Sequence, residues 1–316
     1  MKSPLPALAL FCAFILPTIA AAPLTYDQQE AHLKSWYAHL VPTLPPGTVS
    51  VIDQAYVPNP IRGISPDSSQ LLDLFVPAGP GPFPLVVNIH GGGWHAGGKE
   101  GGIAECKPYL LHGIAYASLG YRWVQDAHFP AQMEDCNDAI GWLRAHAAQY
   151  HLDPNEVGVF GHSAGAHLCA LIGTTGDGAT FKNPQKVQAV VCASGPFDLD
   201  RDRGQWPKSM FMWNPRDPMA PFFPNGVYDT AFARYASPET YIHPGLPPFF
   251  ILHGDADTTV PLGQAQVFAA DLKKAGDDVT IRIGPGKNHG SILDAQAKAE
   301  ALAFFEKNLQ HQAPNP

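Results

Sequence analysis

The chain has 316 residues, of which 45% are hydrophobic and only 15% are charged, and its formal net charge is −8. This composition excludes a disordered, highly charged chain, and the length allows one large α/β domain with a sizeable core. Acidic residues outnumber basic ones by 28 to 20 and no basic run occurs, which argues against binding nucleic acid or an anionic membrane through bulk electrostatics.

The N-terminus has the pattern of a secretory signal peptide. Lys2 supplies a positive charge, residues 7–16 are apolar, and Pro17 precedes the small residues 20–22. A transmembrane helix would need about 20 apolar residues, and no later stretch of the sequence comes close. We therefore expect residues 1–21 to be cleaved and the mature protein, secreted or periplasmic, to have no integral membrane segment. A buried N-terminal helix is the alternative.

Apolar, strand-like runs then alternate with helical patterns, which is typical of βαβ units and a largely parallel sheet. The predicted strands are residues 49–57, 70–76, 84–90, 114–121, 156–160, 187–194, 249–253 and 279–283. The predicted helices are residues 132–149, 164–173, 263–275 and 291–309, with a weaker amphipathic candidate at 26–40. The sequence thus predicts a single α/β domain over residues 22–310, followed by a tail at 311–316.

One segment, residues 198–241, interrupts this alternation. It is dense in aromatic residues, methionines and prolines and has no clear periodicity. A long segment of this kind inside a compact domain is more often a lid or binding loop than a linker. We expect a small cap insertion. Two interpretations of its aromatic residues stay open, because they would suit either an apolar acyl pocket or a small core of the cap itself.

The most informative motif is Gly161-His162-Ser163-Ala164-Gly165, which follows a strand-like run and opens a helical pattern. Glycines on both sides of the serine allow the backbone to turn sharply from strand to helix and lift the hydroxyl clear of the sheet. We predict that Ser163 is a nucleophile. An ordinary strand-to-helix turn is the alternative.

A second motif, HGGGW at residues 90–94, follows another apolar strand. Bare glycines let backbone N–H groups point into a cleft, which is what stabilisation of a tetrahedral oxyanion requires. We predict an oxyanion hole formed by the N–H groups of Gly92, Gly93 and Ala164, with Trp94 beside it as a substrate-binding residue. A flexible loop is the alternative.

Two polar turns follow late strands, HGDADTTVP at 253–261 and GKNHG at 286–290. A serine hydroxyl is a poor nucleophile unless an imidazole takes its proton and a carboxylate fixes the imidazole tautomer. The chain order Ser163, Asp257, His289 is the order in which such groups occur on this type of fold.

Together these motifs resemble those of the α/β-hydrolase superfamily, in the hormone-sensitive-lipase-like branch with feruloyl and acetyl esterases. The resemblance runs from about residue 56 to 308. It implies a mostly parallel eight-stranded sheet flanked by helices, and a serine carboxylesterase mechanism without metal or organic cofactor. In such enzymes the carboxylate is the second acid of the HGxxD turn, here Asp257, with Asp255 as the alternative.

Most of the 14 histidines lie outside these motifs. We expect them, His167 included, to be surface residues or structurally hydrogen-bonded. His162 is expected to point away from the nucleophile, and His90 and His253 are expected to shape their turns.

No metal site is predicted. Residues 198–202 resemble the start of a calcium loop but lack its glycine and its final glutamate. The cysteines after the signal form no C-x-x-C pair and match no zinc spacing, so they are expected to be small, buried apolar residues. One disulfide of unknown pairing is the alternative. These cysteines are Cys106, Cys136, Cys169 and Cys192.

Three functions stay open at this point. The first is a secreted ester hydrolase acting on a small-molecule or polysaccharide-linked ester, such as a feruloyl, acetyl or other short-chain ester. The second is an amidase-type relative such as kynurenine formamidase, which export argues against. The third is an inactive hydrolase fold used for binding, which the complete serine, aspartate and histidine set argues against. The sequence does not indicate the acyl or alcohol specificity or the oligomeric state.

Overall fold

The computed structural model describes residues 25–61, 63–200 and 222–309. The predicted signal peptide at 1–21 and the predicted tail at 311–316 lie outside these residues, as do residues 201–221 of the predicted cap. Within the described ranges, no helix is both long and apolar enough to cross a membrane.

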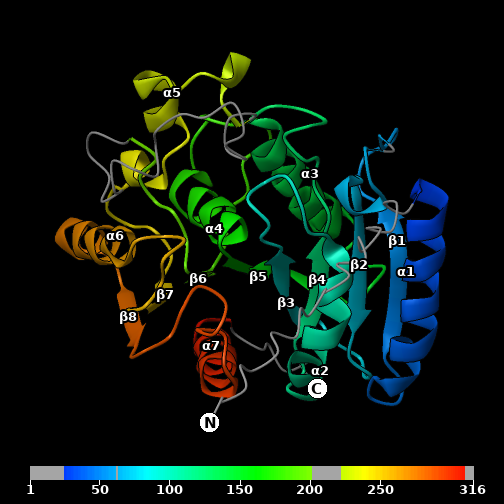
Figure 1. Cartoon of the computed structure of the whole chain (residues 1–316). Coiled ribbons are helices and arrows are strands. Elements are labelled where there is room, and N and C mark those ends of the chain that lie inside the picture. The colour runs from blue at the N-terminus through cyan, green and yellow to red at the C-terminus, as the bar shows by residue number, and fades with distance from the viewer. Residues whose placement is uncertain (1–24, 62, 201–221, 310–316) are drawn as a thin grey trace, which may run out of the picture.

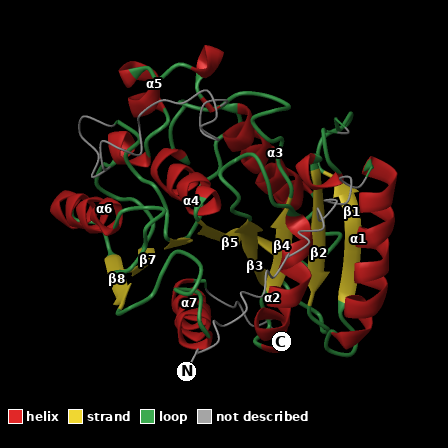
Figure 2. Cartoon of the chain, in the orientation of Figure 1, coloured by secondary structure: helices red, strands yellow, loops and turns green. Residues whose placement is uncertain are grey.

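Eight strands form one sheet in the order β1-β2-β4-β3-β5-β6-β7-β8 (Figure 2). They are β1 (Val49–Ala55), β2 (Leu71–Val76), β3 (Phe83–Ile89), β4 (Ala115–Leu119), β5 (Leu152–His162), β6 (Ala189–Ala193), β7 (Phe249–Gly254) and β8 (Val279–Gly284). The pairs β1–β2 and β2–β4 are antiparallel, and every other neighbouring pair is parallel. The predicted mostly parallel eight-stranded sheet is confirmed, and each predicted run contributes one strand.

Helices cover both faces of this sheet (Figure 1). They are α1 (Tyr26–Leu40), α2 (Gly102–Leu111), α3 (Ala131–Ala145), α4 (Ala164–Thr175), α5 (Thr230–Tyr235), α6 (Leu262–Ala275) and α7 (Ala295–Asn308). Side chains of α3, α4 and α6 share one core with the sheet, and those of α1, α2 and α7 share a second core on the other face.

The central strands are apolar on both sides because both sides are covered. In β3, Leu85, Val87 and Ile89 belong to the core beneath α3 and α4, whereas Val86 belongs to the core beneath α2 and α7. A strand buried on both faces is an almost continuous apolar run. For this reason the apolar runs in the sequence predict where the strands lie, but they do not predict which face of the sheet each side chain occupies.

Helix α2 was not expected from the sequence. Two glycines stand at its start and Pro108 lies inside it, where a proline removes one backbone hydrogen-bond donor. The helix forms because Ile103, Cys106 and Leu110 are buried along one face against the sheet. Tertiary packing therefore outweighs the poor local helix propensity in this segment.

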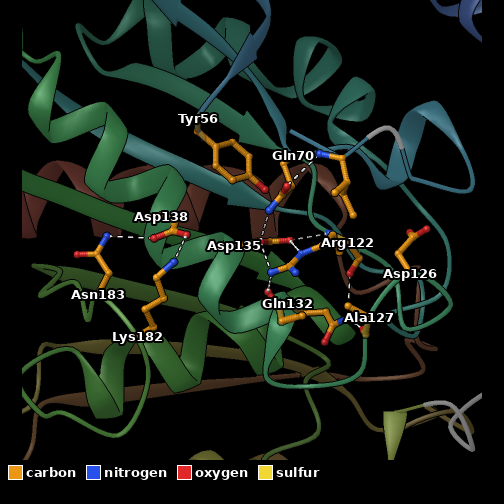
Figure 3. A network of polar contacts seen from close by, with 12 residues as sticks. Tyr56, Gln70, Arg122, Asp126, Ala127, Gln132, Asp135, Asp138, Lys182 and Asn183 are labelled. Carbon is orange, nitrogen blue, oxygen red and sulfur yellow. Dashed lines mark hydrogen bonds and ion pairs between the residues drawn. The ribbon is translucent and has the colours of Figure 1, made fainter. Parts of the chain in front are cut away.

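A buried carboxylate fastens the loop that follows β4 (Figure 3). Asp135 on α3 is fully buried and accepts hydrogen bonds from the guanidinium of Arg122, at 2.7 and 2.8 Å, and from the side-chain amide of Gln70, at 2.7 Å. Gln132 donates to the carbonyl oxygens of Arg122 and Ala127 in the same loop. A buried charge that is paired in this way holds its surroundings in one arrangement.

The part of the predicted cap that the structure describes contains α5 and short 3-10 turns. Phe222 and Phe223 have no exposed surface, and the ring of Phe222 lies 4.6 Å from that of Trp94 and 5.0 Å from that of Phe129. These two aromatic residues therefore belong to the core of the domain. The bounds of the cap stay a prediction, since the following aromatic and methionine residues lie outside the described part: Trp206, Met210, Phe211, Met212 and Trp213.

The four cysteines after the signal are free thiols, and all four are buried: Cys106, Cys136, Cys169 and Cys192. Burial raises the pKa of each thiol. A thiol with a raised pKa is unreactive at neutral pH. Their predicted role as small buried residues is confirmed, and the alternative of a disulfide among them is not.

Candidate active site

Ser163 stands at a sharp turn between β5 and α4. Its backbone has φ 56° and ψ −121°, a conformation that costs free energy for any residue with a Cβ atom. The Ser163 N–H donates to the carbonyl oxygen of Ala193 on β6, at 2.8 Å. The strain thus persists because the neighbouring strand fixes the turn.

The two glycines of the motif are required by close backbone approaches. A Cβ atom at Gly165 would lie 2.0 Å from the carbonyl oxygen of Ile89, and one at Gly161 would lie 2.4 Å from the carbonyl carbon of Gly165. Real Cβ atoms do not come this close to backbone atoms. The turn therefore packs directly against the end of β3.

We predict that Gly165→Ala lowers the free energy of unfolding by about 3 kcal/mol, because the added methyl group must displace the end of β3. Urea denaturation would measure the loss. Gly101→Ala is the matched control, since a Cβ atom at Gly101 meets nothing within 4 Å and should change stability by less than about 0.5 kcal/mol. Equal stability of the two variants would contradict the close packing of the turn.

The structure brings Ser163, His289 and Asp257 into one hydrogen-bonded series. The Nε2 atom of His289 lies 2.9 Å from Ser163 Oγ, and its Nδ1 atom lies 2.8 Å from Asp257 Oδ2. Ser163 follows β5, Asp257 follows β7 and His289 follows β8. The carboxyl ends of parallel strands meet at one edge of the sheet, and open α/β sheets place their ligand sites at that edge. The topology therefore explains how residues far apart in sequence come together.

The carboxylate of Asp257 is well suited to hold an imidazole. Its side chain has no exposed surface, and it also accepts hydrogen bonds from the N–H groups of Thr259 and Val260, at 2.8 and 2.9 Å. Burial alone would raise the pKa of Asp257, but the hydrogen bonds with His289 and with these N–H groups lower it to about 2. The alternative acid, Asp255, instead accepts from the N–H of Gly286 at 2.6 Å.

His162 lies against His289, in the loop after β8, and the expectation that it points away from the nucleophile stays a prediction. Its Nε2 atom is 2.8 Å from the carbonyl oxygen of His289, and the two ring centroids are 4.8 Å apart. A carbonyl oxygen only accepts, so Nε2 of His162 carries the proton. His162, the residue before Ser163 in the turn, therefore faces the loop after β8.

His90 and His253 shape their turns, as expected. His253 is fully buried and its Nε2 atom donates to the carbonyl oxygen of Val260, at 2.9 Å. The Nδ1 atom of His90 lies 2.7 Å from the carbonyl oxygen of Gly91, and its ring stacks on Tyr121 with a centroid distance of 4.1 Å. Burial lowers the pKa of His90 to about 4, so this imidazole is neutral at physiological pH.

Residues 90–98, here called the glycine loop, begin beside Ser163. A Cβ atom at Gly91 would lie 3.3 Å from the Cβ of Ser163. Gly92 and Gly93 have φ angles of 112° and 60°, which favour glycine. Ala164 is the first residue of α4, and the first N–H groups of a helix have no acceptor within it. The glycine loop thus begins beside the serine and α4 begins directly after it, and the role of Gly92, Gly93 and Ala164 as oxyanion donors stays a prediction.

Comparison with known proteins places this chain in a family. The BD-FAE family profile matches residues 72–272. The chain belongs to the BD-FAE family.

Among relatives of this BD-FAE chain, esterase LipQ of Mycobacterium tuberculosis is 29% identical over 233 residues, which cover 70% of this chain and 53% of LipQ. The chain thus spans about half the length of this curated relative. A truncated carbohydrate esterase from gut microbiota is 26% identical, with a TM-score of 0.71 and coverage of 84% of this chain and 98% of that one. The Thermogutta terrifontis esterase Est2, solved with butyrate bound, is 25% identical, with a TM-score of 0.65 and coverage of 86% and 97%.

Trp94 lies inside the core of this BD-FAE domain. Its side chain is 3% exposed, and its indole N–H donates to Nδ1 of His167 at 3.3 Å. The sequence did not predict this contact, and the substrate-binding role expected for Trp94 stays a prediction. The only sequence signal was spacing, because His167 follows Ser163 by four residues and so lies one turn further along α4.

Among the described residues, no group of three or more histidine, cysteine, aspartate or glutamate side chains is arranged to hold a metal ion.

Proposed function

We propose that this chain is a secreted carboxylic ester hydrolase that works through an acyl-enzyme on Ser163. The observation that carries the proposal is the hydrogen-bonded series from Ser163 Oγ through the His289 imidazole to the buried Asp257 carboxylate. Membership of the BD-FAE family and the likeness to esterases support it. The N-terminal sequence pattern supports secretion.

The first half of the reaction forms the acyl-enzyme. Ser163 Oγ attacks the ester carbonyl carbon while Nε2 of His289 takes the hydroxyl proton, and the charged Asp257 stabilises the resulting imidazolium. The tetrahedral intermediate then collapses, the bond between the carbonyl carbon and the alcohol oxygen breaks, and His289 returns the proton to the leaving alcohol.

In the second half, water replaces the alcohol. His289 takes a proton from the water as the water attacks the acyl carbon, and the proton returns to Ser163 Oγ when the acid product leaves. The negative charge of both tetrahedral intermediates falls on the former carbonyl oxygen. The N–H groups of Gly92, Gly93 and Ala164 are the donors we assign to this oxygen, because donors fixed in place before the reaction need no reorganisation.

The proposed substrates are acetyl, feruloyl or other short-chain esters, free or attached to a polysaccharide. A carbohydrate esterase and an esterase that holds butyrate are among the similar structures, which supports a short acyl group and a sugar alcohol. The reaction uses no metal or organic cofactor, since every proton and charge in it is handled by the side chains and N–H groups named above.

A substrate panel tests this function. The full chain after signal removal is assayed with p-nitrophenyl acetate, butyrate and octanoate, with methyl ferulate, and with N-formylkynurenine. We expect hydrolysis of the acetyl, butyryl or feruloyl ester and little or none of the octanoyl ester. Hydrolysis of N-formylkynurenine alone would instead indicate an amidase-type function, and no turnover of any substrate by folded protein would indicate a binding fold.

A further inference from the structure

His167 is a buried imidazole that joins three separate segments of the fold. It lies on α4 with no exposed surface, and its backbone N–H donates to the carbonyl oxygen of Ser163 at 3.1 Å. Its Nδ1 atom accepts from the indole N–H of Trp94 in the glycine loop, at 3.3 Å. Its Nε2 atom lies 2.7 Å from the carbonyl oxygen of Ala236, which follows α5 in the predicted cap.

These partners leave only one protonation state for the ring. The indole of Trp94 only donates, so Nδ1 of His167 must accept and carries no proton. The carbonyl oxygen of Ala236 only accepts, so Nε2 must donate. Burial lowers the pKa of His167 to about 4, which keeps the ring in this neutral form at physiological pH. Each ring nitrogen is thus committed to one neighbouring segment.

The indole of Trp94 connects His167 to the glycine loop. Trp94 follows Gly93 directly and has a φ of 61°, unusual for a residue with a large side chain. Its ring meets His167 edge to face at 5.1 Å and packs on Phe222 of the predicted cap. Because the indole is held on these sides, its position fixes the backbone to which the predicted oxyanion donors belong.

A different segment holds the outer part of the glycine loop. In the loop after β4, Val124 N–H donates to the carbonyl oxygen of Trp94 at 2.9 Å, and the Trp123 indole donates to that of Gly97 at 3.0 Å. The ion pair of Arg122 and Asp135 anchors this supporting loop (Figure 3). The backbone of His90, where the glycine loop begins, packs against Gly165 of α4, and His167 adds a side-chain hydrogen bond between α4 and Trp94 further along the loop.

We propose that His167 is a positioning residue that sets the glycine loop, through Trp94, at the correct distance from Ser163 and couples it to the predicted cap at Ala236. The inference rests on the proposed ester hydrolysis. Oxyanion donors act mainly in the transition state, so a displaced loop lowers kcat more than it raises KM. A displacement of about 1 Å away from the reacting atoms can cost about 100-fold in rate.

The test uses His167→Leu, His167→Gln, Trp94→Phe and the double variant His167→Leu/Trp94→Phe, assayed on the preferred ester of the panel. Leucine removes both hydrogen bonds, glutamine keeps one donor and one acceptor, and phenylalanine removes the indole donor together with part of the ring. We expect His167→Leu to lower kcat about 10- to 100-fold with little change in KM, glutamine to restore much of this loss, and the double variant to be no worse than His167→Leu.

His146→Gln is the matched control, because His146 also pairs with a tryptophan, stacking on Trp142 at 4.0 Å, but does so at the C-terminal end of α3. It should keep kcat within about twofold. A trifluoromethyl ketone, which forms a tetrahedral adduct with the serine, should lose affinity for His167→Leu in parallel with kcat. Unchanged kcat in His167→Leu, a loss confined to KM, or multiplicative losses in the double variant would overturn the proposal.

Equilibrium unfolding of the same proteins separates this inference from the proposed function. Should the wild-type chain hydrolyse no ester, the proposed function fails, but the coupling between His167 and Trp94 is still measured by the cycle of single and double variants. We expect the destabilisation of the double variant to be smaller than the sum of the two single destabilisations. Additive values would overturn the coupling between His167 and Trp94. If His167→Leu does not fold, His167→Gln with Trp94→Phe completes the same cycle.

Discussion

Replacing Ser163 with alanine is expected to abolish ester hydrolysis and leave the protein folded. The variant lacks the oxygen that forms the acyl-enzyme. The kcat should therefore fall by about 10⁴- to 10⁶-fold, which is the range found when the nucleophile of a serine, histidine and aspartate triad is removed. Initial rates with p-nitrophenyl butyrate measure the loss, and circular dichroism with thermal unfolding checks the fold.

The matched control for this experiment is Ser194→Ala. Ser194 follows the neighbouring strand β6 and has a φ of 50°, close to the 56° of Ser163, but its side chain is fully buried and its Oγ has no hydrogen-bond partner among the described residues. This variant should keep kcat within a few-fold. If Ser163→Ala retained even a tenth of the wild-type rate, Ser163 would not be the nucleophile.

The second large effect is expected from Asp257→Asn, which should lower kcat by about 10⁴-fold. An asparagine can present its amide N–H₂ to His289, which favours the wrong imidazole tautomer and cannot stabilise the imidazolium. The KM should change little, because the side chain of Asp257 has no exposed surface with which to meet substrate. Steady-state kinetics on the preferred ester of the panel measure both parameters.

Asp255→Asn is the matched control for the carboxylate, since it alters the other acid of the same turn. Asp255 accepts from the Gly286 N–H rather than from His289, so its replacement should cost only a few-fold in kcat. Comparable losses in the two variants would contradict the assignment of Asp257 and would point to disruption of the turn as a whole.

The sequence predicted the sheet and the convergence of the three polar residues because both depend on local signals. Strands buried on two faces are apolar runs, and the segment around Ser163 combines a strand, a tight turn and a helix start within a few residues. Ser163, Asp257 and His289 were expected to lie together from their order in the chain and from the resemblance, and the sheet explains why they do, since strands of a parallel sheet end at the same edge.

The features that the sequence missed depend on contacts between distant segments. Helix α2 has glycines and Pro108 that argue against a helix, and only its packing on the sheet explains it. His167 is structurally hydrogen-bonded, as expected, but nothing near it or His162 in sequence reveals that their acceptors are the carbonyl oxygens of Ala236 and His289. Such partners are set by the folded chain.

The central claim is that His289 and Asp257 activate the hydroxyl of Ser163, and covalent labelling with paraoxon tests it most directly. Intact mass spectrometry should show one diethylphosphoryl group per wild-type chain, peptide mapping should place it on Ser163, and the loss of hydrolysis should follow the labelling. His289→Ala should label far more slowly, and Ser163→Ala should not label. Full loss of activity with the group on another residue, or rapid labelling of Ser163 without His289, would contradict the account.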